Sequence, residues 1–219
     1  MSAFVVAIDG PAGSGKSSVS KKVAAELGFG YLDTGAAYRA LTWWLANKRN
    51  FDLALAASGD FASGFDYSIS TDPNNYWVHV GQTDLTEAIR QPEVAQKVSA
   101  VAQLPAVRTF MRELTRQIVA DCDRPGIVVE GRDITTVVLP DANLRLLLTA
   151  SESVRLARRS AEAPASAHLG LEVSKRDETD SKVVDFMNPA PGVTLVDSTE
   201  LDFAQTVDHI KALIAAASH

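Results

Sequence analysis

The sequence predicts an α/β fold with a five-stranded parallel sheet, helices on both faces, a small antiparallel insert and a short lid. Five short apolar runs alternate with stretches of helical apolar spacing, and one stretch alternates polar and apolar residues instead. Runs that are apolar throughout are typical of buried parallel strands, and the helices between them supply the crossovers. The length suits a single domain, 1–219, with the insert at about 63–100 and the lid at about 160–185.

The predicted strands are the five apolar runs. They lie at residues 4–8, 30–32, 126–130, 144–148 and 193–196. The segments around them predict helices at residues 16–27, 36–47, 92–120, 151–162 and 201–217. Gly28 suits the C-cap of the first helix, and Pro105 is expected to kink or break the third.

Two segments break the alternation of strands and helices. Residues 65–90 alternate polar and apolar side chains around the turn sequence DPNN, which predicts a small antiparallel sheet. Residues 162–182 are rich in Ala and Ser and then charged, and we interpret them as part of a mobile lid.

The bulk composition argues against several classes of protein. The single cysteine, Cys122, allows no intramolecular disulfide and is typical of a reduced compartment, so we expect a cytoplasmic protein. No apolar stretch approaches the roughly 20 residues that a membrane span needs, so we expect no membrane contact. The net charge of −6 argues against nucleic-acid binding. We expect a monomer that acts on small molecules.

Residues 10–17, GPAGSGKS, follow the first predicted strand and open the first predicted helix. They match the phosphate-loop pattern G-x-x-x-x-G-K-[ST] in full. Its glycines let backbone amides point at phosphate oxygens, and the helix adds the positive end of its dipole. Lys16 is expected to reach the β- and γ-phosphates of ATP, and the Ser17 hydroxyl to bind Mg²⁺. The predicted ATP-binding residues are Gly10, Pro11, Ala12, Gly13, Ser14, Gly15, Lys16, Ser17 and Ser18. A glycine-rich surface turn is the alternative, which the flanking strand and helix disfavour.

A phosphate loop alone does not separate kinases from GTPases, motors or transporters. The guanine-reading pattern N-K-x-D is absent, because Asn47 and Lys48 are followed by Arg49 and Asn50. A motor ATPase would normally be larger than this chain. The placement of the arginines therefore decides between the remaining classes.

Two helices carry arginines where anionic groups would lie. Thr34 falls at the start of the second helix, where backbone amides are free, and Arg39 follows one turn later. A capped helix with a solvated arginine is the alternative. Arg155, Arg158 and Arg159 share one helix face, and phosphoryl transfer needs such charge on the moving group. A solvated basic face is the alternative there.

The third predicted strand ends in Glu130, which is followed by Gly131, Arg132 and Asp133. In open α/β sheets, ligands bind at the carboxyl ends of strands, so Arg132 and Asp133 are expected at the ligand cleft. Glu130 is the acidic group expected near the water shell of Mg²⁺. A structural ion pair is the alternative for Arg132 and Asp133.

Six motifs occur along nearly the whole chain: AIDGPAGSGKSS, LDTGAAYR, IRQPEV, VSAVAQLPAVR, VVEGRDITTVVLPDA and KRDETDS. In this order they resemble the motifs of bacterial cytidylate kinases, a family of P-loop nucleoside monophosphate kinases. The resemblance implies a P-loop kinase core of five parallel strands, an insert in the monophosphate-binding region, and a lid. It implies that ATP and CMP or dCMP react to give ADP and CDP or dCDP, with Mg²⁺ as cofactor.

The resemblance also implies roles for individual residues. Those implied to hold the CMP phosphate are Thr34, Arg39 and Arg132. Those implied to face the cytosine are Ser99, Arg108 and Asp133. Those implied to meet the acceptor phosphate and ribose are Arg176 and Asp180, with Arg90, at the end of the insert, as a further candidate. Those implied to clamp the transferred phosphoryl group are Arg155, Arg158 and Arg159, beside Lys16.

The trio implied to face the base also makes chemical sense for cytosine. The Asp133 carboxylate would accept from the N4 amino group, while Arg108 donates to the ring acceptors N3 and O2. Uracil has a carbonyl in place of the amino group, which would face the carboxylate without a donor. An unpaired buried polar group costs about 1 to 3 kcal/mol, so we expect CMP to be preferred over UMP by roughly tenfold to a hundredfold.

Two features depart from the family pattern R-D-x-x-D-S-x-R and its lid. Val183 stands where the last arginine belongs, and Lys182 is expected to supply part of that charge as a point charge. The lid between Arg159 and Lys175 is short. Two alternatives stay open: another small-acceptor P-loop kinase, such as one for shikimate or adenylate, and a noncatalytic nucleotide sensor. The base-facing trio and the insert argue against the first, and the missing arginine favours the second.

Overall fold

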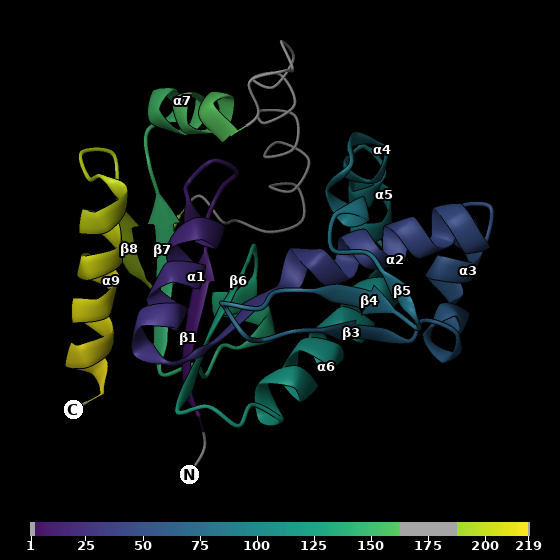
Figure 1. Ribbon diagram of the computed structural model, residues 1–219, viewed down its shortest axis with the longest axis horizontal. Helices are drawn as coiled ribbons and strands as arrows, with labels where there is room; N and C mark the ends of the chain where they lie inside the picture. The colour runs from purple at the N-terminus through teal and green to yellow at the C-terminus, as the bar shows by residue number, and fades with distance from the viewer. Residues whose placement is uncertain (1–2, 163–187, 219) are drawn as a thin grey trace.

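A five-stranded parallel sheet in the order β2–β6–β1–β7–β8 forms the centre of the computed structural model (Figure 1). The structure describes residues 3–162 and 188–218 of the chain. The strands are β1 (Phe4–Asp9), β2 (Gly30–Asp33), β6 (Gly126–Gly131), β7 (Leu144–Thr149) and β8 (Thr194–Asp197). Each strand boundary lies within one residue of its prediction, which confirms the predicted parallel sheet.

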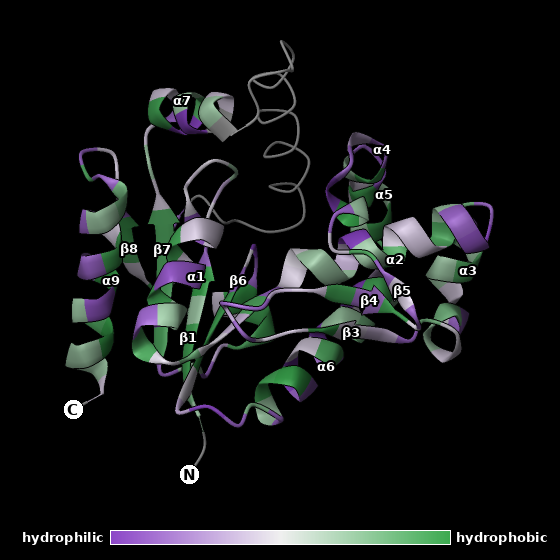
Figure 2. Ribbon diagram, in the orientation of Figure 1, coloured by the Kyte–Doolittle hydropathy of each residue, from purple (hydrophilic) through white to green (hydrophobic). Residues whose placement is uncertain are grey.

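Helices cover both faces of this sheet, as predicted. On one face, α1 (Lys16–Leu27) and α9 (Phe203–Ala217) pack over the sheet through a buried cluster that includes Val23 of α1, Ile210 of α9 and Ile8 of β1. On the other face, the short π-helical turn η3 (Ile134–Val138) and part of α6 (Pro105–Ala120) cover the strands. In Figure 2 the strands β1, β6 and β7 are largely green, the colour of hydrophobic residues.

The carboxyl ends of the strands meet at the edge of the sheet that also receives α2 (Thr34–Lys48) and α7 (Glu152–Glu162). In the parallel register Asp9 lies opposite Gly131, and Asp33 lies opposite Glu130. Segments far apart in the sequence are thereby brought to one place. In Figure 1 this edge is uppermost, with α7 above the loop that joins β1 to α1.

Helix α2 begins two residues before its predicted start at residue 36. The Asp33 side chain caps the helix by accepting a hydrogen bond of 3.2 Å from the backbone amide of Ala36. This cap satisfies an amide that would otherwise lack a partner, and it fixes the first turn at the carboxyl end of β2.

The insert lies at the β2 side of the sheet (Figure 1) and contains the predicted antiparallel sheet, with strands β3 (Tyr67–Ile69), β4 (Val78–Val80) and β5 (Thr83–Asp84). The elements within and beside the insert that surround this small sheet are α3 (Leu53–Ser58), η1 (Asp60–Ser63), η2 (Ala88–Arg90), α4 (Pro92–Ala95) and α5 (Val98–Ala102). The predicted helix at 92–120 is therefore three helices. Pro105 starts α6, as expected of a residue that breaks a helix, and a second break follows α4.

The tip of the β3–β4 hairpin rests on the central sheet. The backbone amide of Tyr31 donates to the carbonyl of Thr71 at 2.8 Å, and Arg124 pairs with Asp72 at 3.1 Å. Tyr76 packs against both the apolar cluster of the insert and the cluster between the sheet, α1 and α9. The insert is therefore fastened to the core at the edge of β2.

The predicted lid at about 160–185 lies outside the described residues, apart from the end of α7. Within residues 3–162 and 188–218, none of the helices has the length and apolarity to span a membrane.

Candidate active site

The glycine-rich loop between β1 and α1 has the tight backbone that its sequence predicts. Gly13 and Gly15 have φ angles of 76° and 84°, a region that side chains other than glycine rarely occupy. A Cβ on Gly10 would lie 2.2 Å from the carbonyl oxygen of Leu148, so the loop passes too close to β7 for any side chain there. Helix α1 begins at Lys16 directly after the loop, and its first amides therefore face the loop interior.

The arginine face of α7 lies against this loop. Arg155 is buried and donates to the carbonyl of Ala12 at 2.9 Å. Arg158 donates to the carbonyl of Ser14 at 3.2 Å and to the carbonyl of Ser198 at 2.9 Å. Arg155 and Arg158 thus lie on the same face of α7, and both contact the glycine-rich loop. They fix the backbone of the loop, and their contact with the transferred phosphoryl group stays a prediction.

A buried carboxylate lies beside the lysine and serine of the loop. Glu130 is 2% exposed and accepts hydrogen bonds from the hydroxyls of Tyr31, at 3.0 Å, and Ser17. Burial raises the pKa of Glu130, and the negative charge of Asp33 raises it further, while the Lys16 ammonium lowers it. A carboxylate and a hydroxyl are hard oxygen donors of the kind that Mg²⁺ prefers, so Ser17 and Glu130 fit that ion.

The carboxyl end of β2 carries an ion pair. Arg39 reaches back one turn along α2 and donates to the Asp33 carboxylate at 2.5 Å, and its side chain is 18% exposed. A Cβ on Gly35 would lie 2.9 Å from the Arg39 guanidinium, so the glycine lets this side chain lie across the start of the helix. The Thr34 hydroxyl donates to the carbonyl of Glu130 at 2.8 Å. The predicted residues Thr34 and Arg39 thus both lie at the end of β2, beside β6.

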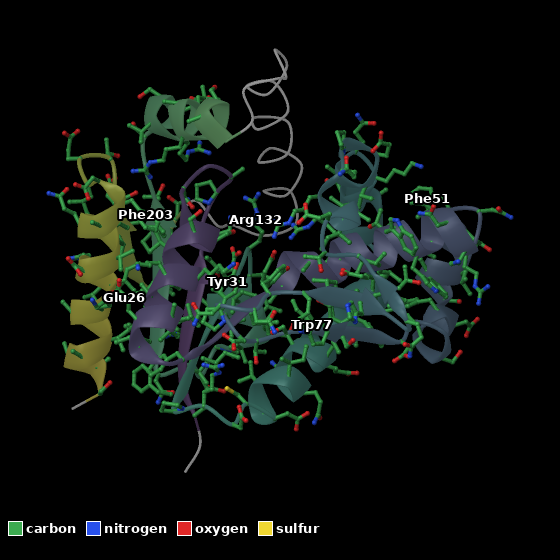
Figure 3. All side chains as sticks on the ribbon, in the orientation of Figure 1. Glu26, Tyr31, Phe51, Trp77, Arg132 and Phe203 are labelled. Carbon is green, nitrogen blue, oxygen red and sulfur yellow. The ribbon has the colours of Figure 1, made fainter. Side chains whose placement is uncertain are left out.

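A second ion pair joins α6 to the end of β6. Arg108 of α6 donates to the Asp133 carboxylate at 2.6 Å, although the two residues are 25 positions apart in the sequence. Burial raises the pKa of Asp133, and the Arg108 guanidinium opposes that shift. Arg132 is half-buried and lies between α7 and the insert (Figure 3). The structure therefore brings Arg108, Asp133 and Arg132 to the same edge as the glycine-rich loop.

Asp9, the residue before the glycine-rich loop, holds the segment after Asp133 in place. Its carboxylate is 3% exposed and accepts from the backbone amides of Ile134, at 2.8 Å, and Thr135, at 2.9 Å. The Thr135 hydroxyl adds a third hydrogen bond at 2.6 Å. The last residue of β1 thus ties the loop after β6 to the start of the phosphate loop.

The other predicted residues divide into two groups. Ser99 is half-buried on α5, and Arg90 is exposed with its guanidinium 5.6 Å from the centre of the Tyr76 ring. The predicted positions outside the described residues are Arg176, Asp180, Lys182 and Val183, together with the side chain of Arg159.

Sequence reasoning assigned no site role to Asp9, Tyr31 or Asp33, although all three fix groups at this edge. A signal was present for the two aspartates, because each ends an apolar buried strand, where an unpaired carboxylate would be costly. No comparable signal marked Tyr31, whose partner Glu130 lies on another strand.

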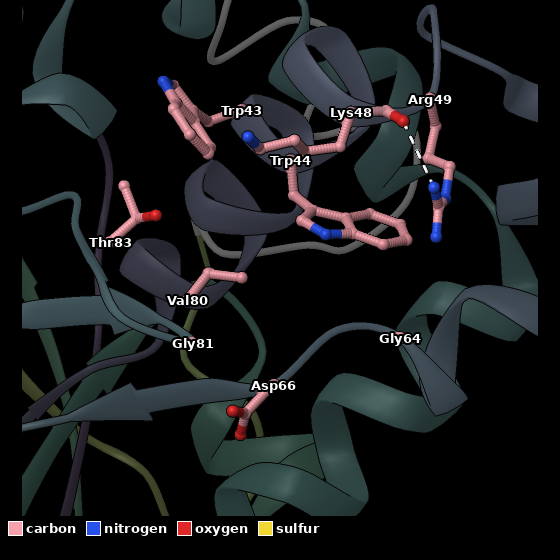
Figure 4. A pocket seen from close by; sticks show the side chains of 9 residues that line it. All are labelled: Trp43, Trp44, Lys48, Arg49, Gly64, Asp66, Val80, Gly81 and Thr83. Carbon is pink, nitrogen blue, oxygen red and sulfur yellow. Dashed lines mark hydrogen bonds between the residues drawn. The ribbon is translucent and has the colours of Figure 1, made fainter.

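A separate pocket of about 300 Å³ lies between the end of α2 and the insert (Figure 4). It is lined by Trp43, Trp44, Lys48, Arg49, Gly64, Asp66, Val80, Gly81 and Thr83. None of the residues predicted for the site lines it, and Arg49 there stacks on the Trp44 ring at 4.8 Å. We therefore place the candidate site at the carboxyl ends of the strands.

A glycine-rich phosphate loop after the central strand, with arginines and carboxylates around it, defines a P-loop nucleotide-binding fold. In agreement, a gluconokinase from Sinorhizobium meliloti 1021 superimposes with a TM-score of 0.53 over 98% of this chain and 94% of that one. At 16% sequence identity, this likeness concerns the fold alone.

A family model described as cytidylate kinase matches residues 6–216. The chain is 44% identical to the cytidylate kinase of Streptomyces avermitilis over 97% of this chain and 93% of that protein. It is 42% identical to the cytidylate kinase of Cutibacterium acnes, over 97% and 96% of the two chains. The chain belongs to the cytidylate kinase family, which confirms the resemblance found in the sequence.

Proposed function

We propose that the protein transfers the γ-phosphoryl group of ATP to CMP or dCMP, giving ADP and CDP or dCDP in pyrimidine nucleotide metabolism. The observation that carries this proposal is the Arg108–Asp133 pair, 2.6 Å apart and mostly buried, at the edge that also holds the phosphate loop. A carboxylate and a guanidinium side by side offer an acceptor and donors, which is the pattern that the N4, N3 and O2 atoms of cytosine require.

The donor nucleotide binds along residues 10–18, with its phosphates enclosed by the amides of the loop and by Lys16. Ser17 and Glu130 are the residues that would hold Mg²⁺ near these phosphates. When bound, Mg²⁺ would neutralise charge on the β- and γ-phosphate oxygens. Arg155 and Arg158 keep the loop in shape through their hydrogen bonds to its carbonyls. Arg155, Arg158 and Arg159 also lend positive charge to the transferred group.

The acceptor nucleotide lies across the ends of β2 and β6. The residues proposed to bind its phosphate are Thr34, Arg39 and Arg132. The residues proposed to read its base are Ser99, Arg108 and Asp133. The residues proposed to complete the acceptor site from outside the described ranges are Arg176 and Asp180, with Arg90 at the rim of the insert. Lys182 takes over part of the charge of the arginine that Val183 replaces.

The reaction is an in-line displacement at the γ-phosphorus. An oxygen of the CMP phosphate forms the new P–O bond while the bond to the β–γ bridging oxygen breaks, and ADP leaves with the electron pair of that bond. No covalent enzyme intermediate is needed, because positioning and positive charge supply most of the acceleration. Closure of the lid at about 160–185 would exclude water and suppress ATP hydrolysis.

We also propose a cytoplasmic monomer that forms one domain over residues 1–219, with the insert at about 63–100. It acts on small nucleotides without nucleic-acid or membrane partners. The single cysteine and the net charge of −6 support this proposal.

The decisive experiment measures ADP release with CMP, dCMP, UMP, AMP and shikimate as acceptors, with Mg²⁺ and with EDTA. We expect CMP and dCMP to stimulate release, with CMP ahead of UMP by at least about tenfold in kcat/KM. EDTA is expected to abolish the activity. A preference for AMP or shikimate would identify another small-acceptor kinase, and no stimulation by any acceptor would identify a nucleotide sensor.

Two variants test the acceptor residues in the same assay. Arg39→Met and Arg132→Met are each expected to lower kcat/KM for CMP by about a hundredfold or more, because each removes a charge-assisted contact to the acceptor phosphate. Lys22→Met is the control, since Lys22 is an exposed α1 residue that pairs with Glu26 on the same helix. Normal CMP turnover in both arginine variants would refute the proposed acceptor site.

A further inference from the structure

Helix α6 presents three arginines at intervals of four residues: Arg108, Arg112 and Arg116. Residues at this spacing lie on one side of a helix, about one turn apart. Arg108 pairs with Asp133, and Arg116 donates to the carbonyls of Val138, at 2.8 Å, and Val137, at 3.2 Å. The arginines on either side of Arg112 therefore both bind the segment 133–138.

Arg112 is half-buried and lies on α6 between these two contacts. Its positive charge acts on Asp133 and on the Tyr38 phenol of α2, lowering the pKa of each against the effect of burial. Burial and the negative charge of Asp133 still raise the pKa of Tyr38 to about 12, so this phenol stays neutral. Within residues 3–162 and 188–218, Arg112 forms no hydrogen bond or ion pair that would use its charge elsewhere.

The charged groups around Asp133 come from three elements. Helix α6 contributes the cations Arg108 and Arg112, helix α2 contributes the neutral Tyr38, and β1 contributes the anion Asp9. The Asp133 side chain is 14% exposed, so water stabilises its charge only in part. An anion in this position needs compensating positive charge from the protein.

We propose that Arg112 is a specificity-determining positioning residue, which keeps Asp133 anionic while Arg108 is engaged with the base of the acceptor. This inference rests on the proposed function. Within the described residues, Arg108 is the only direct ion-pair partner of Asp133. When Arg108 donates to the ring acceptors of cytosine, its charge is shared between the substrate and Asp133. Arg112 then supplies the second positive charge beside the carboxylate.

The consequence concerns the choice between CMP and UMP. An anionic Asp133 accepts from the N4 amino group of cytosine and repels the O4 carbonyl of uracil. A protonated Asp133 carries a donor and would bind the uracil carbonyl instead. Arg112 therefore acts on selectivity through the charge state of Asp133, without touching the reacting atoms.

The test compares Arg112→Met, which removes the charge and keeps an apolar stem, with Arg112→Lys, which keeps the charge. The kinetic constants for CMP, UMP and ATP are measured at pH 6 and pH 8. For Arg112→Met we expect the ratio of kcat/KM for CMP over UMP to fall about tenfold at pH 6 and less at pH 8. The reason is that the loss of one neighbouring positive charge favours the protonated form of Asp133, and more so at the lower pH. The KM for ATP should stay within about twofold, and Arg112→Lys should recover most of the ratio.

Arg116→Met is the matched control, because it removes an arginine from the same helix that binds only carbonyls of 137–138. It should leave the selectivity ratio unchanged at both pH values. If Arg112→Met fails to fold, as judged by circular dichroism, Arg112→Gln takes its place with the same expectations.

Two outcomes overturn the inference: an unchanged selectivity ratio in the folded charge-removing variant, or an equal loss in Arg116→Met. Wild-type protein that does not phosphorylate CMP refutes the proposed function instead. A third pattern of results separates the two: wild type prefers CMP, Arg108→Met loses that preference, and the neutral Arg112 variant keeps it. In that case the proposed function stands and only the role of Arg112 fails.

Discussion

Arg158 is the residue for which structural support and direct catalysis give opposite expectations. Its guanidinium donates to the carbonyls of Ser14, Ser198 and Leu201 and to the Ser198 hydroxyl, at 2.9 to 3.2 Å. Arg158→Met removes all four hydrogen bonds and leaves three carbonyls without this donor. At about 1 kcal/mol for each of the three, the free energy of unfolding should fall by about 3 kcal/mol.

For a chain of this length, such a loss lowers the Tm by about 6 to 12 °C, which thermal unfolding followed by circular dichroism measures directly. The KM for ATP should rise as well, because the Ser14 carbonyl belongs to the phosphate loop. Lys22→Met serves as the control, since an exposed pair within one helix contributes only about 0.2–0.5 kcal/mol.

A residue that only stabilises the transition state would behave differently. Its removal would lower kcat and leave the Tm unchanged. If Arg158→Met unfolds within about 2 °C of wild type, the hydrogen bonds to the phosphate loop and to Ser198 do not support the fold, and the reasoning is refuted. The Tm of Arg158→Lys should lie between those of wild type and Arg158→Met, because an ammonium cannot reach all of these acceptors at once.

Two further predictions concern aspartates at the ends of strands. Asp9→Asn should lower the free energy of unfolding by about 2 to 3 kcal/mol in urea denaturation, because the amide NH₂ would replace one carboxylate oxygen and face either the amide of Ile134 or the donors of Thr135. An unchanged midpoint would contradict this. Burial raises the pKa of Asp133, so its protonated form should appear at a higher pH than that of an exposed aspartate. The ratio of kcat/KM for CMP over UMP should therefore fall as the pH is lowered from 8 to 5. The measurement with UMP corrects for titration of the phosphate group, which both substrates carry. A constant ratio would show that Asp133 does not read the base.

Much of the fold follows from the sequence because the five core strands are continuous apolar runs. Each is predicted to within one residue. Burial on both faces gives the clearest signal in β6, whereas the edge strand β8 has only Val196 buried. The helices of the insert were less predictable. The break after α4 has no proline or glycine, and tertiary packing against α2 rather than local propensity divides the segment 92–104 into α4 and α5.

The site was predictable where one motif fixes its own geometry. The loop at 10–17 needs only its glycines and the helix that follows. The ion pair between Arg108 and Asp133 could not be read from local spacing, because it joins α6 to the end of β6. Likewise the spacing of Arg155 and Arg158 predicted a shared face, but what that face contacts depends on how α7 returns over the loop.

Two of the arginines proposed to meet the acceptor are each paired with a carboxylate of the protein, Arg39 with Asp33 and Arg108 with Asp133. Each carboxylate offsets the charge of its own arginine, so these two positions attract inorganic phosphate and other small anions less strongly than unpaired arginines would. A molecule with a phosphate at one end and a base at the other engages both pairs at once, and so gains more binding free energy than either fragment alone. The resting pairs thus act as a filter that favours whole nucleotides over fragments of them.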